Sequence, residues 1–219
     1  MNKKNTYRII LGAEDWSLSD FYTFPHLLEQ CYAWLYCLDY KTHTALSNEK
    51  NPLSTYPWAG GYSVVHAYAL FDKQIHADDR PMIAGIKKTS PGWLDLASNV
   101  AVIYKLAAAL PVVAGAVPSL LFAAKKAYKL ITEINEMRRK NRDANLKATA
   151  AQLKSAHAIS VELAKGLGYK NLEAMDAITG NEEISMKLLM AHYRRMTHLL
   201  EFVQNGKATF PTEESPHEK

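Results

Sequence analysis

The feature that most constrains this fold is an uncharged, mostly apolar run, Leu106–Ala124, at the end of the apolar segment 97–124. Its length is close to the roughly 20 apolar residues that a helix needs to cross a bilayer. No other stretch of the chain is as uniformly apolar. The run therefore contacts a membrane or forms the centre of a helical core, and the rest of the fold has to accommodate it.

Composition bounds the class of protein. The chain has 219 residues, of which 48% are hydrophobic and 22% charged, so it can bury a real core in one domain or two small ones and is not disordered throughout. The net charge of +4 is modest. Its distribution is uneven, because residues 125–147 carry eight Lys or Arg against three acidic residues. The basic surplus thus lies directly beside the apolar run.

The N-terminal part, residues 1–96, predicts a small α+β domain. A strand is expected over Tyr7–Leu11, followed by a helix that begins at Ser17 or Ser19 and carries a wide aromatic face. Two β-type runs flank Ser90-Pro91-Gly92 and predict a hairpin. Together they would make a small antiparallel sheet covered by the helix. Residues 62–75 fit a short helix or a strand.

The second part, residues 97–206, predicts helices. Residues 123–166 contain no Gly or Pro until their end and favour a long basic helix, whose small and apolar stripe would allow coiled-coil self-association. The polar residues around Arg142 leave open whether this helix is continuous or folds back as a hairpin. A C-terminal helical pair is expected next, a short helix capped by Asn171 and a longer one from Ile184 to Val203. Residues 207–219 predict a disordered polar tail.

Three interpretations compete for the apolar run. A helix that spans the membrane fits its length and the basic block after it, but a single crossing would place residues 1–96 outside, and they show no export signal. A re-entrant or in-plane hairpin bent at Pro111, Gly115 and Pro118 would keep both flanks in the cytoplasm. A buried helix pair of a soluble domain is the third interpretation.

Motifs that carry chemistry are few. The sequence holds no Gly-rich phosphate loop, nucleophile elbow, HExxH or CxxC motif, so no catalytic residue, cofactor or metal is predicted and the chain is expected not to be an enzyme. The nearest approach to an acid/base cluster is formed by His66, His76, Asp78 and Asp79, where a loop is the simpler interpretation. Cys31 and Cys37 are too far apart along one helix to bridge, which fits a reducing compartment.

Two sets of residues are candidates for binding. Nucleic acid is not expected, because the basic block lacks interleaved aromatic residues, whereas a basic run beside an apolar segment suits anionic lipid. The residues predicted to contact the membrane are Leu106, Leu110, Val112, Val113, Val117, Leu120, Leu121 and Phe122. Those predicted to contact anionic lipid or a partner are Lys125, Lys126, Arg138, Arg139, Lys140 and Arg142.

The sequence also resembles a loosely defined set of uncharacterised bacterial proteins. These share an RPxI strand, an SPG turn, a hydrophobic segment and a long charged helix, which correspond here to Arg80-Pro81-Met82-Ile83, Ser90-Pro91-Gly92 and the regions that follow. Further similar positions are Ile178-Thr179-Gly180-Asn181, Tyr193-Arg194-Arg195 and Asn205-Gly206-Lys207. The resemblance implies a bacterial cytoplasmic or inner-membrane origin, and brings no known activity.

These observations predict a non-enzymatic, membrane-associated bacterial protein that self-associates as a homo-oligomer and acts by assembly as an effector or regulator. Its expected place is the cytoplasmic face of the inner membrane, and antiphage defence is one setting for such a protein. The alternative is a soluble, cytoplasmic helical interaction module or a subunit of a larger complex. An unknown protein partner is compatible with both.

Overall fold

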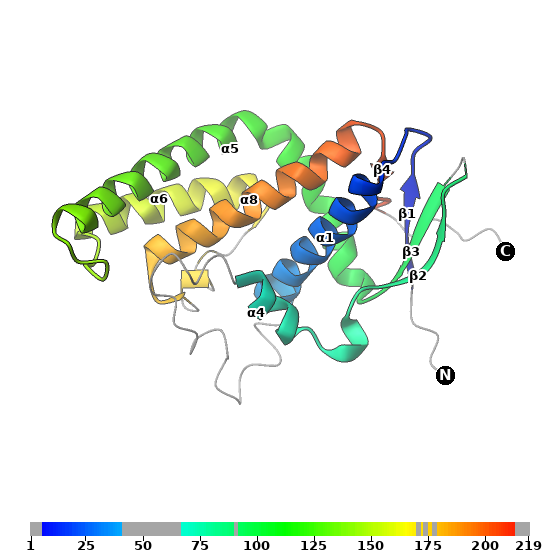
Figure 1. The fold of residues 1–219 in the computed structure, drawn as a ribbon, viewed down its shortest axis with the longest axis horizontal. Helices are drawn as coiled ribbons and strands as arrows, with labels where there is room; N and C mark the ends of the chain where they lie inside the picture. The colour runs from blue at the N-terminus through cyan, green and yellow to red at the C-terminus, as the bar shows by residue number, and fades with distance from the viewer. Residues whose placement is uncertain are drawn as a thin grey trace. The chain divides into compact units, whose positions relative to one another are not determined.

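The fold is α+β, with one small sheet and several helices (Figure 1). The computed structural model describes residues 6–40, 67–89, 92–169, 172, 175–176 and 179–212. In chain order the elements are β1 Thr6–Leu11, α1 Leu18–Leu35, the π-helical turn η1 Tyr36–Tyr40, α4 Ala67–Gln74, the 3-10 turn η2 Ala77–Asp79, β2 Met82–Lys87, β3 Gly92–Ala97, α5 Val100–Lys140, α6 Ala150–Gly166, α8 Glu182–Gln204 and β4 Ala208–Thr209.

The chain divides into two compact units, which differ from the predicted domains 1–96 and 97–206. The first, called the sheet unit, comprises the described residues of Met1–Tyr40, Phe71–Pro111 and Arg195–Lys219. The second, called the helical unit, comprises those of Lys41–Leu70 and Val112–Arg194. Both α5 and α8 contribute residues to each unit, so the boundary falls inside helices and no composition shift marks it.

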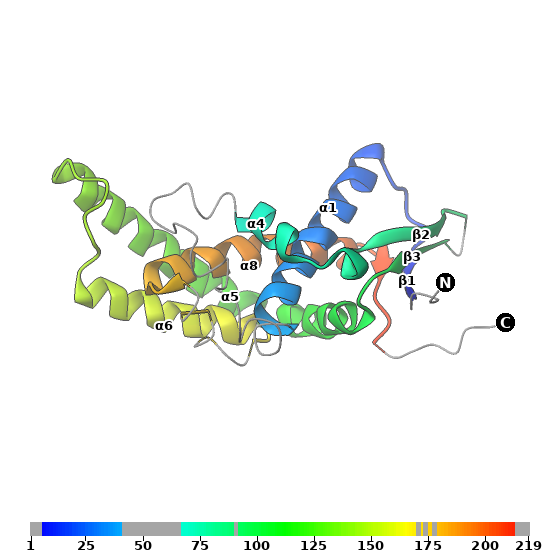
Figure 2. The same cartoon turned by 90° about the horizontal axis from the view of Figure 1, so that it is seen from below.

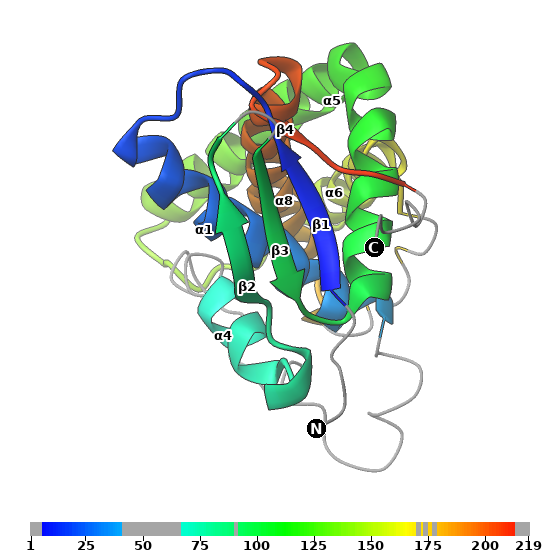
Figure 3. The ribbon, with the colours of Figure 1, turned by 90° about the vertical axis from the view of Figure 1, so that its right-hand side faces the viewer.

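The sheet has the strand order β2-β3-β1-β4 and is antiparallel throughout (Figure 3). β1 pairs with β3 along its whole length, from Thr6 opposite Ala97 to Leu11 opposite Gly92. Every second side chain of β1 and β3 is buried, which is the period expected of strands with one covered face. The predicted strand and hairpin are therefore confirmed, although residues 90–91 of the turn lie outside the described residues.

Helix α1 covers the buried face of this sheet (Figures 1 and 3). It begins with a capping box, in which the Ser17 hydroxyl accepts from the Asp20 backbone N–H and the Asp20 carboxylate accepts from the Ser17 N–H. The aromatic face predicted for this helix packs into the core, where Phe24 lies 5.2 Å from Phe202 and Trp34 lies 5.6 Å from Phe71 between ring centroids. Core packing is thus the role of the aromatic stripe.

The disordered tail was predicted to begin at residue 207, which is too early in the chain. β4 pairs with β1 through Ile10 opposite Thr209 and Leu11 opposite Ala208. The Lys207 ammonium donates to the Asp20 carboxylate at 2.8 Å, and the Tyr7 hydroxyl donates to the Pro211 carbonyl at 2.6 Å. Residues up to 212 are therefore part of the sheet unit. The signal was weak because two residues are too few to show the alternation of a strand.

The helical unit is built from the C-terminal part of α5, from α6 and from the first part of α8 (Figure 2). Lys126 pairs with Glu162, and Gly166 lies against Leu120, so α6 runs antiparallel to α5. Arg138 pairs with Glu183, and the Arg194 guanidinium lies over the Tyr128 ring, so α8 also runs antiparallel to α5. The predicted final helix is confirmed, with Asn181 accepting from the first free N–H groups; most of the predicted short helix 171–178 lies outside the described residues.

Helix α5 is continuous from Val100 to Lys140, through Pro111, Gly115 and Pro118. A hairpin bend at these residues, which the re-entrant hairpin among the three interpretations required, does not occur. A proline inside a helix removes one backbone hydrogen bond and crowds the carbonyl four residues before it, yet it does not have to end the helix when the surrounding turns are held by packing.

The end of α5 answers whether the long basic helix is continuous or folds back near Arg142. Arg142 has φ +52°, and the chain closes with hydrogen bonds from the Arg142 N–H to the Arg139 carbonyl and from the Asp143 N–H to the Arg138 carbonyl. This is a Schellman motif, which ends a helix on a left-handed residue. The same pattern at the end of α6 uses Gly168, with φ +82°. The long helix therefore folds back as a helical hairpin.

Candidate membrane-binding surface

The apolar run presents two faces. Val113, Leu120, Ala123 and Ala124 are buried inside the helical unit, with exposed fractions of 2% or less. On the outside the run exposes Val112 by 46%, Leu121 by 47% and Phe122 by 60%, and Gly115 and Pro118 are exposed as well. We call these five residues the outer stripe: Val112, Gly115, Pro118, Leu121 and Phe122.

The inner face follows a strict spacing of alternate fours and threes. It runs through Leu106, Leu110, Val113, Val117, Leu120, Ala124, Ala127, Ile131 and Ile134. All except Val117 and Ile131, which are partly exposed, are buried. The spacing keeps one side of a helix turned toward its neighbours. The inner face is therefore a packing seam, and its close fit shows at Gly166, where an added Cβ would lie 2.5 Å from Leu120 Cδ2.

The structure divides the eight residues predicted to contact the membrane. Four of them, Leu106, Leu110, Val113 and Leu120, are at most 3% exposed and pack inside the protein, so they are unavailable to lipid in this fold. Val112, Leu121 and Phe122 lie on the outer stripe, and Val117 is half-buried beside it. The predicted segment does have an exposed apolar face, but only part of its surface is accessible.

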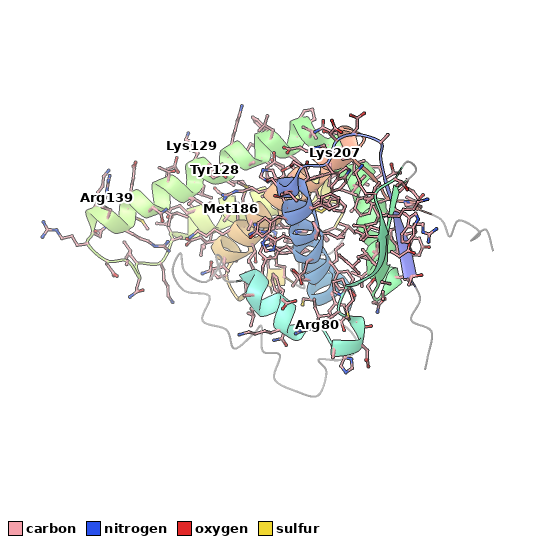
Figure 4. All side chains as sticks on the ribbon, turned by 45° about the vertical axis from the view of Figure 1, so that its right-hand side comes forward. Arg80, Tyr128, Lys129, Arg139, Met186 and Lys207 are labelled. Atoms are coloured by element: carbon pink, nitrogen blue, oxygen red, sulfur yellow. The ribbon has the colours of Figure 1, made fainter. Side chains whose placement is uncertain are left out.

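Basic side chains adjoin the outer stripe at its C-terminal end. Lys125 and Lys129 are exposed, and Figure 4 shows Lys129 projecting from α5. The Lys126 ammonium lies 4.4 Å from the centroid of the Phe122 ring and pairs with Glu162 at 3.0 Å. Lys129 and Tyr128, which is 47% exposed, were missed by the sequence analysis. The spacing of the inner face could have identified them. Both positions lie between Ala127 and Ile131 of that face and therefore point to another side of the helix.

The predicted basic set is also divided. Arg139, Lys140 and Arg142 are exposed near the end of α5, and Figure 4 shows Arg139 pointing outward. Arg138 instead turns inward and donates to both carboxylate oxygens of Glu183 at 2.8 Å, and its Nε donates to the Leu146 carbonyl at 2.9 Å. Arg138 therefore holds the helical hairpin together and does not face a lipid or a partner.

Among the described residues of the helical unit, Glu183 has the most enclosed carboxylate, with 5% of its side chain exposed. Burial alone raises the pKa of such a group, but hydrogen bonds and charges from Arg138 and Lys187 lower it by more. The pKa of Glu183 therefore lies below its usual value, and the same pairing raises the pKa of Arg138. The cluster is an ionised structural network at neutral pH.

The residues that came nearest to an acid/base cluster in the sequence, where a loop was the simpler interpretation, include a structural anchor at Asp79. The Asp79 carboxylate accepts from the Tyr36 hydroxyl at 2.7 Å and from the Asn99 amide at 3.4 Å, and the Asp79 carbonyl accepts from the Tyr32 hydroxyl. These contacts hold the turn η2 against α1 and the start of α5. His76 lies 3.6 Å from Asp78 on the surface, and His66 lies outside the described residues.

Histidine and cysteine side chains occupy packed positions. His192 is fully buried between the hydroxyls of Tyr169, at 2.6 Å from Nε2, and Tyr68, at 3.5 Å from Nδ1. Cys31 and Cys37 are free and buried, and burial raises the pKa of each thiol to about 12, so neither is a reactive thiolate. Among the residues that the structure describes, no three His, Cys, Asp or Glu side chains are grouped as metal ligands would be.

The helix that carries the outer stripe is as long and as apolar as a membrane-spanning helix. Within the described chain, α5 is the one helix long and apolar enough to span a bilayer, with a best 18-residue window of mean hydropathy 2.1, of which 33% is buried. Core helices of soluble proteins also reach such values. Comparisons with models of protein families, with curated proteins and with solved structures found no match. The resemblance to bacterial proteins stays a prediction.

Proposed function

We propose that this chain is a non-enzymatic protein that binds a membrane surface through the outer stripe of α5 and acts there by assembly. The observation that carries the proposal is the outer stripe itself, because the most apolar helix of the chain leaves Val112, Leu121 and Phe122 about half exposed beside exposed lysines. An apolar helix face bordered by basic residues is typical of a helix that lies in the plane of a membrane interface.

The contacts of the inner face favour an in-plane helix over a spanning one. Gly166 packs against Leu120, and the preceding residue, Lys165, is exposed at the same level of the bundle. The Lys126–Glu162 ion pair lies about two turns further along. If α5 crossed the bilayer, these charges would enter the hydrocarbon, at about 2.5–3.5 kcal/mol or more for each charged side chain. With α5 in the interface plane they stay in water.

The expected affinity of one copy is low. Complete burial of a Val, Leu or Phe side chain contributes about 1.5–3 kcal/mol, so three half-exposed side chains would contribute about 3 kcal/mol. Two lysines near an anionic surface would add about 2 kcal/mol. A total of about 5 kcal/mol corresponds to a dissociation constant of roughly 0.2 mM. Copies that bind together on one surface would gain avidity, which is why assembly belongs to the proposal.

The proposed location is the cytoplasmic face of a bacterial inner membrane, where anionic lipids would attract Lys125 and Lys129. The buried free cysteines suit a reducing compartment. An effector or regulator that acts by assembly, for example in antiphage defence, is the role that we infer for such a protein.

Vesicle flotation tests the proposal. We expect the wild-type protein to float with phosphatidylglycerol–phosphatidylethanolamine vesicles and to float less with neutral phosphatidylcholine vesicles. Val112→Glu should abolish flotation and leave the fold intact, because Val112 is 46% exposed. Its neighbour Val113 is fully buried, so Val113→Glu should unfold the protein instead. The matched control is Tyr22→Glu, at a 77% exposed apolar side chain of α1, which should float as the wild type does.

A second candidate is a soluble helical interaction module, in which the outer stripe binds a helix of another protein. It is favoured by the inner face, most of which is buried inside the protein, as in the core helix of a soluble protein. Wild-type protein that stays in the soluble fraction with every vesicle composition would exclude membrane binding and leave this candidate. Flotation that is lost in Val112→Glu and retained in Tyr22→Glu would exclude the module as the main function.

A further inference from the structure

The end of the helical hairpin carries more positive charge than the fold neutralises. We define the hairpin tip as residues 139–147, at the end of α5 and in the loop that follows. Four of its side chains are cationic, exposed and without an ion pair in the part of the chain that the structure describes: Arg139, Lys140, Arg142 and Lys147. Its one acidic residue is Asp143, whose carboxylate accepts a hydrogen bond from the Asn145 N–H at 2.8 Å. The tip therefore has a formal charge of +3.

The backbone of the hairpin tip is fixed by the fold. Arg142 closes α5 with φ +52°, and the Arg138 Nε–H donates to the Leu146 carbonyl at 2.9 Å. Glycine adopts a positive φ at the least cost, as Gly168 does at the end of α6. An arginine at the equivalent position adds charge to the tip although it is less favourable for the backbone. The tip thus presents its cations on a loop that is ordered before any partner binds.

The hairpin tip lies in line with the outer stripe. Phe122 and Lys140 are 18 residues apart, which is five whole turns of an α-helix, and residues 122–140 contain no Gly or Pro. Both side chains therefore leave α5 on the same side, about 27 Å apart. Lys129, about two turns after Phe122, leaves on this side too. Figure 4 shows Lys129 and Arg139 projecting from the helix.

We propose that the hairpin tip is a second, electrostatic contact with the membrane surface, and that its partner is the phosphate headgroups of anionic lipids. When α5 lies in the interface plane with Phe122 in contact with lipid, Lys129 and Lys140 meet the headgroups along the same line. The inference deepens the proposed function and rests on it. The outer stripe supplies the apolar contact, and the tip supplies much of the preference for anionic lipid.

Two acidic residues on the same helix oppose this contact and give it a distinctive signature. Glu133 and Glu136 lie between Lys129 and Lys140, are exposed, and form no ion pair with a described residue. From Lys125 to residue 147, six exposed cations outside ion pairs stand against three exposed acidic residues. Attraction to an anionic surface therefore exceeds the repulsion. Neutralising the two glutamates should strengthen binding, which a contact confined to the outer stripe does not predict.

The surroundings of the tip favour lipid over nucleic acid as the partner. Residues 129–168 contain no Phe, Trp or Tyr, so the tip offers no ring on which a base could stack. The apolar residues Leu121 and Phe122 lie at the other end of the same exposed helix. A bilayer offers contacts to both ends, because its headgroups are charged and its interior is apolar, whereas a phosphate backbone offers contacts to the cations alone.

Vesicle flotation over a series of lipid concentrations tests the contact. Against phosphatidylglycerol-rich vesicles, Arg139→Gln/Lys140→Gln should raise the dissociation constant about 30-fold, which is the scale of two basic residues at an anionic surface. Against neutral phosphatidylcholine vesicles this variant should bind as the wild type does, because its outer stripe is unchanged. Circular dichroism should show an unaltered fold, since both side chains are exposed.

The matched control is Lys154→Gln/Lys165→Gln, which removes the same charge from exposed positions of α6. Lys165 stays in water when α5 lies in the interface plane, and Lys154 is about three turns away on the same side of α6. The control should change the affinity for anionic vesicles by less than about 2-fold, because these charges are screened from the surface. A loss as large as that of the tip variant would show that only net charge matters and would overturn the tip contact.

The acidic residues provide a test of opposite sign. Glu133→Gln/Glu136→Gln should lower the dissociation constant for phosphatidylglycerol-rich vesicles about 10-fold and leave binding to phosphatidylcholine vesicles unchanged. Unchanged affinity for both vesicles would mean that this part of α5 does not face the membrane, and the proposal would be wrong. Arg139→Lys should bind as the wild type does, because a lipid surface responds to charge and not to the shape of a guanidinium group.

The outcomes separate the tip contact from the proposed function. Wild-type protein that floats, together with a tip variant that floats equally well, would overturn the tip contact and leave the function of the outer stripe standing. Wild-type protein that floats with no vesicle would overturn both. Fluorescence anisotropy with a labelled DNA duplex covers the remaining partner. Duplex binding that is lost in Arg139→Gln/Lys140→Gln, while vesicle binding is unchanged, would assign the tip to nucleic acid and refute the lipid contact.

Discussion

The two faces of the apolar run in α5 both lack charged residues, and they have different surroundings. Leu120 is fully buried and Leu121, the next residue, is 47% exposed. One leucine fills a space against Gly166, and the other adds to a surface that nothing in the described chain covers. Hydrophobicity alone therefore does not separate a core residue from a binding residue. The position on the helix, relative to a repeat of threes and fours, does.

The same contrast recurs in the basic part of the helix. Arg138 is enclosed and doubly paired with Glu183, whereas Arg139 is exposed. Two arginines that look equivalent in sequence thus have different roles, one in holding the fold and one at the surface. Substitutions at adjacent residues, one on each face, test this division between inner and outer faces directly.

The largest effect is expected at Leu120. Leu120→Ala should lower the free energy of unfolding by about 2–5 kcal/mol, because it removes buried methyl groups and leaves a cavity. Leu121→Ala should change it by less than about 1 kcal/mol, because the side chain is already half in water. Urea unfolding followed by circular dichroism measures both. Equal losses in the two variants would show that the faces do not differ.

Next in size is the ionic network. Arg138→Ala should cost about 2–3 kcal/mol, since it leaves the Glu183 carboxylate enclosed without its main partner, and Arg139→Ala should lie within about 0.5 kcal/mol of the wild type. The lowered pKa of Glu183 means that this stability is present above the unfolded value of about 4.3 and is lost as the pH falls through the folded value.

The pH dependence can be checked with Glu183→Gln. Below about pH 4 the wild type should lose stability more steeply than this variant, because the carboxylate must then be protonated in the folded state. Urea midpoints measured between acid and neutral pH give the comparison. Parallel curves for the two proteins would contradict the assignment of Glu183 as an ionised partner.

A smaller effect tests the fit of the inner face. Gly166→Ala should destabilise by about 1–3 kcal/mol, because the added Cβ would lie 2.5 Å from Leu120 Cδ2. The cost should shrink in the Leu120→Ala background, where the space is vacant. A double-mutant cycle of the four unfolding free energies measures this coupling. Additive losses would mean that the two residues are not in contact.

The smallest effect has the opposite sign. Gly115 belongs to the outer stripe, and a Cβ at this position would meet no atom within 4 Å. Gly115→Ala should therefore stabilise the protein by about 0.5–1 kcal/mol through helix propensity. Thermal unfolding midpoints would show the gain. A destabilised variant would indicate that this side of α5 is covered.

Much of the fold could be predicted from local rules. The strand at Tyr7–Leu11, the hairpin and the start of α1 at Ser17 follow from alternation, turn residues and a capping box. The failures were long-range. β4 was missed because its two residues form a strand only through their pairing with β1. A bend of α5 was left open as one of three interpretations, because the packing that sustains a helix through Pro111 and Pro118 is not a local property.

The sequence predicted which segment carries the candidate surface. It did not predict which residues of that segment are exposed. The repeat that places Leu120, Ala124 and Ala127 on one side was evident in the sequence beyond the run, and extended backwards it reaches Val113 and Leu110. Within the run it is hidden, because the residues between its members are apolar too. Arg138 was misplaced for a related reason, since its partner Glu183 is 45 residues away.

The central position of β1 has a consequence for biosynthesis. Its neighbours in the sheet are β3, some ninety residues later, and β4, near residue 209. As the ribosome makes the chain in order, β1 waits for both partners, and α5 emerges in full before β4 exists. The nascent protein therefore exposes its most apolar helix while β1 still lacks its pairing with β4.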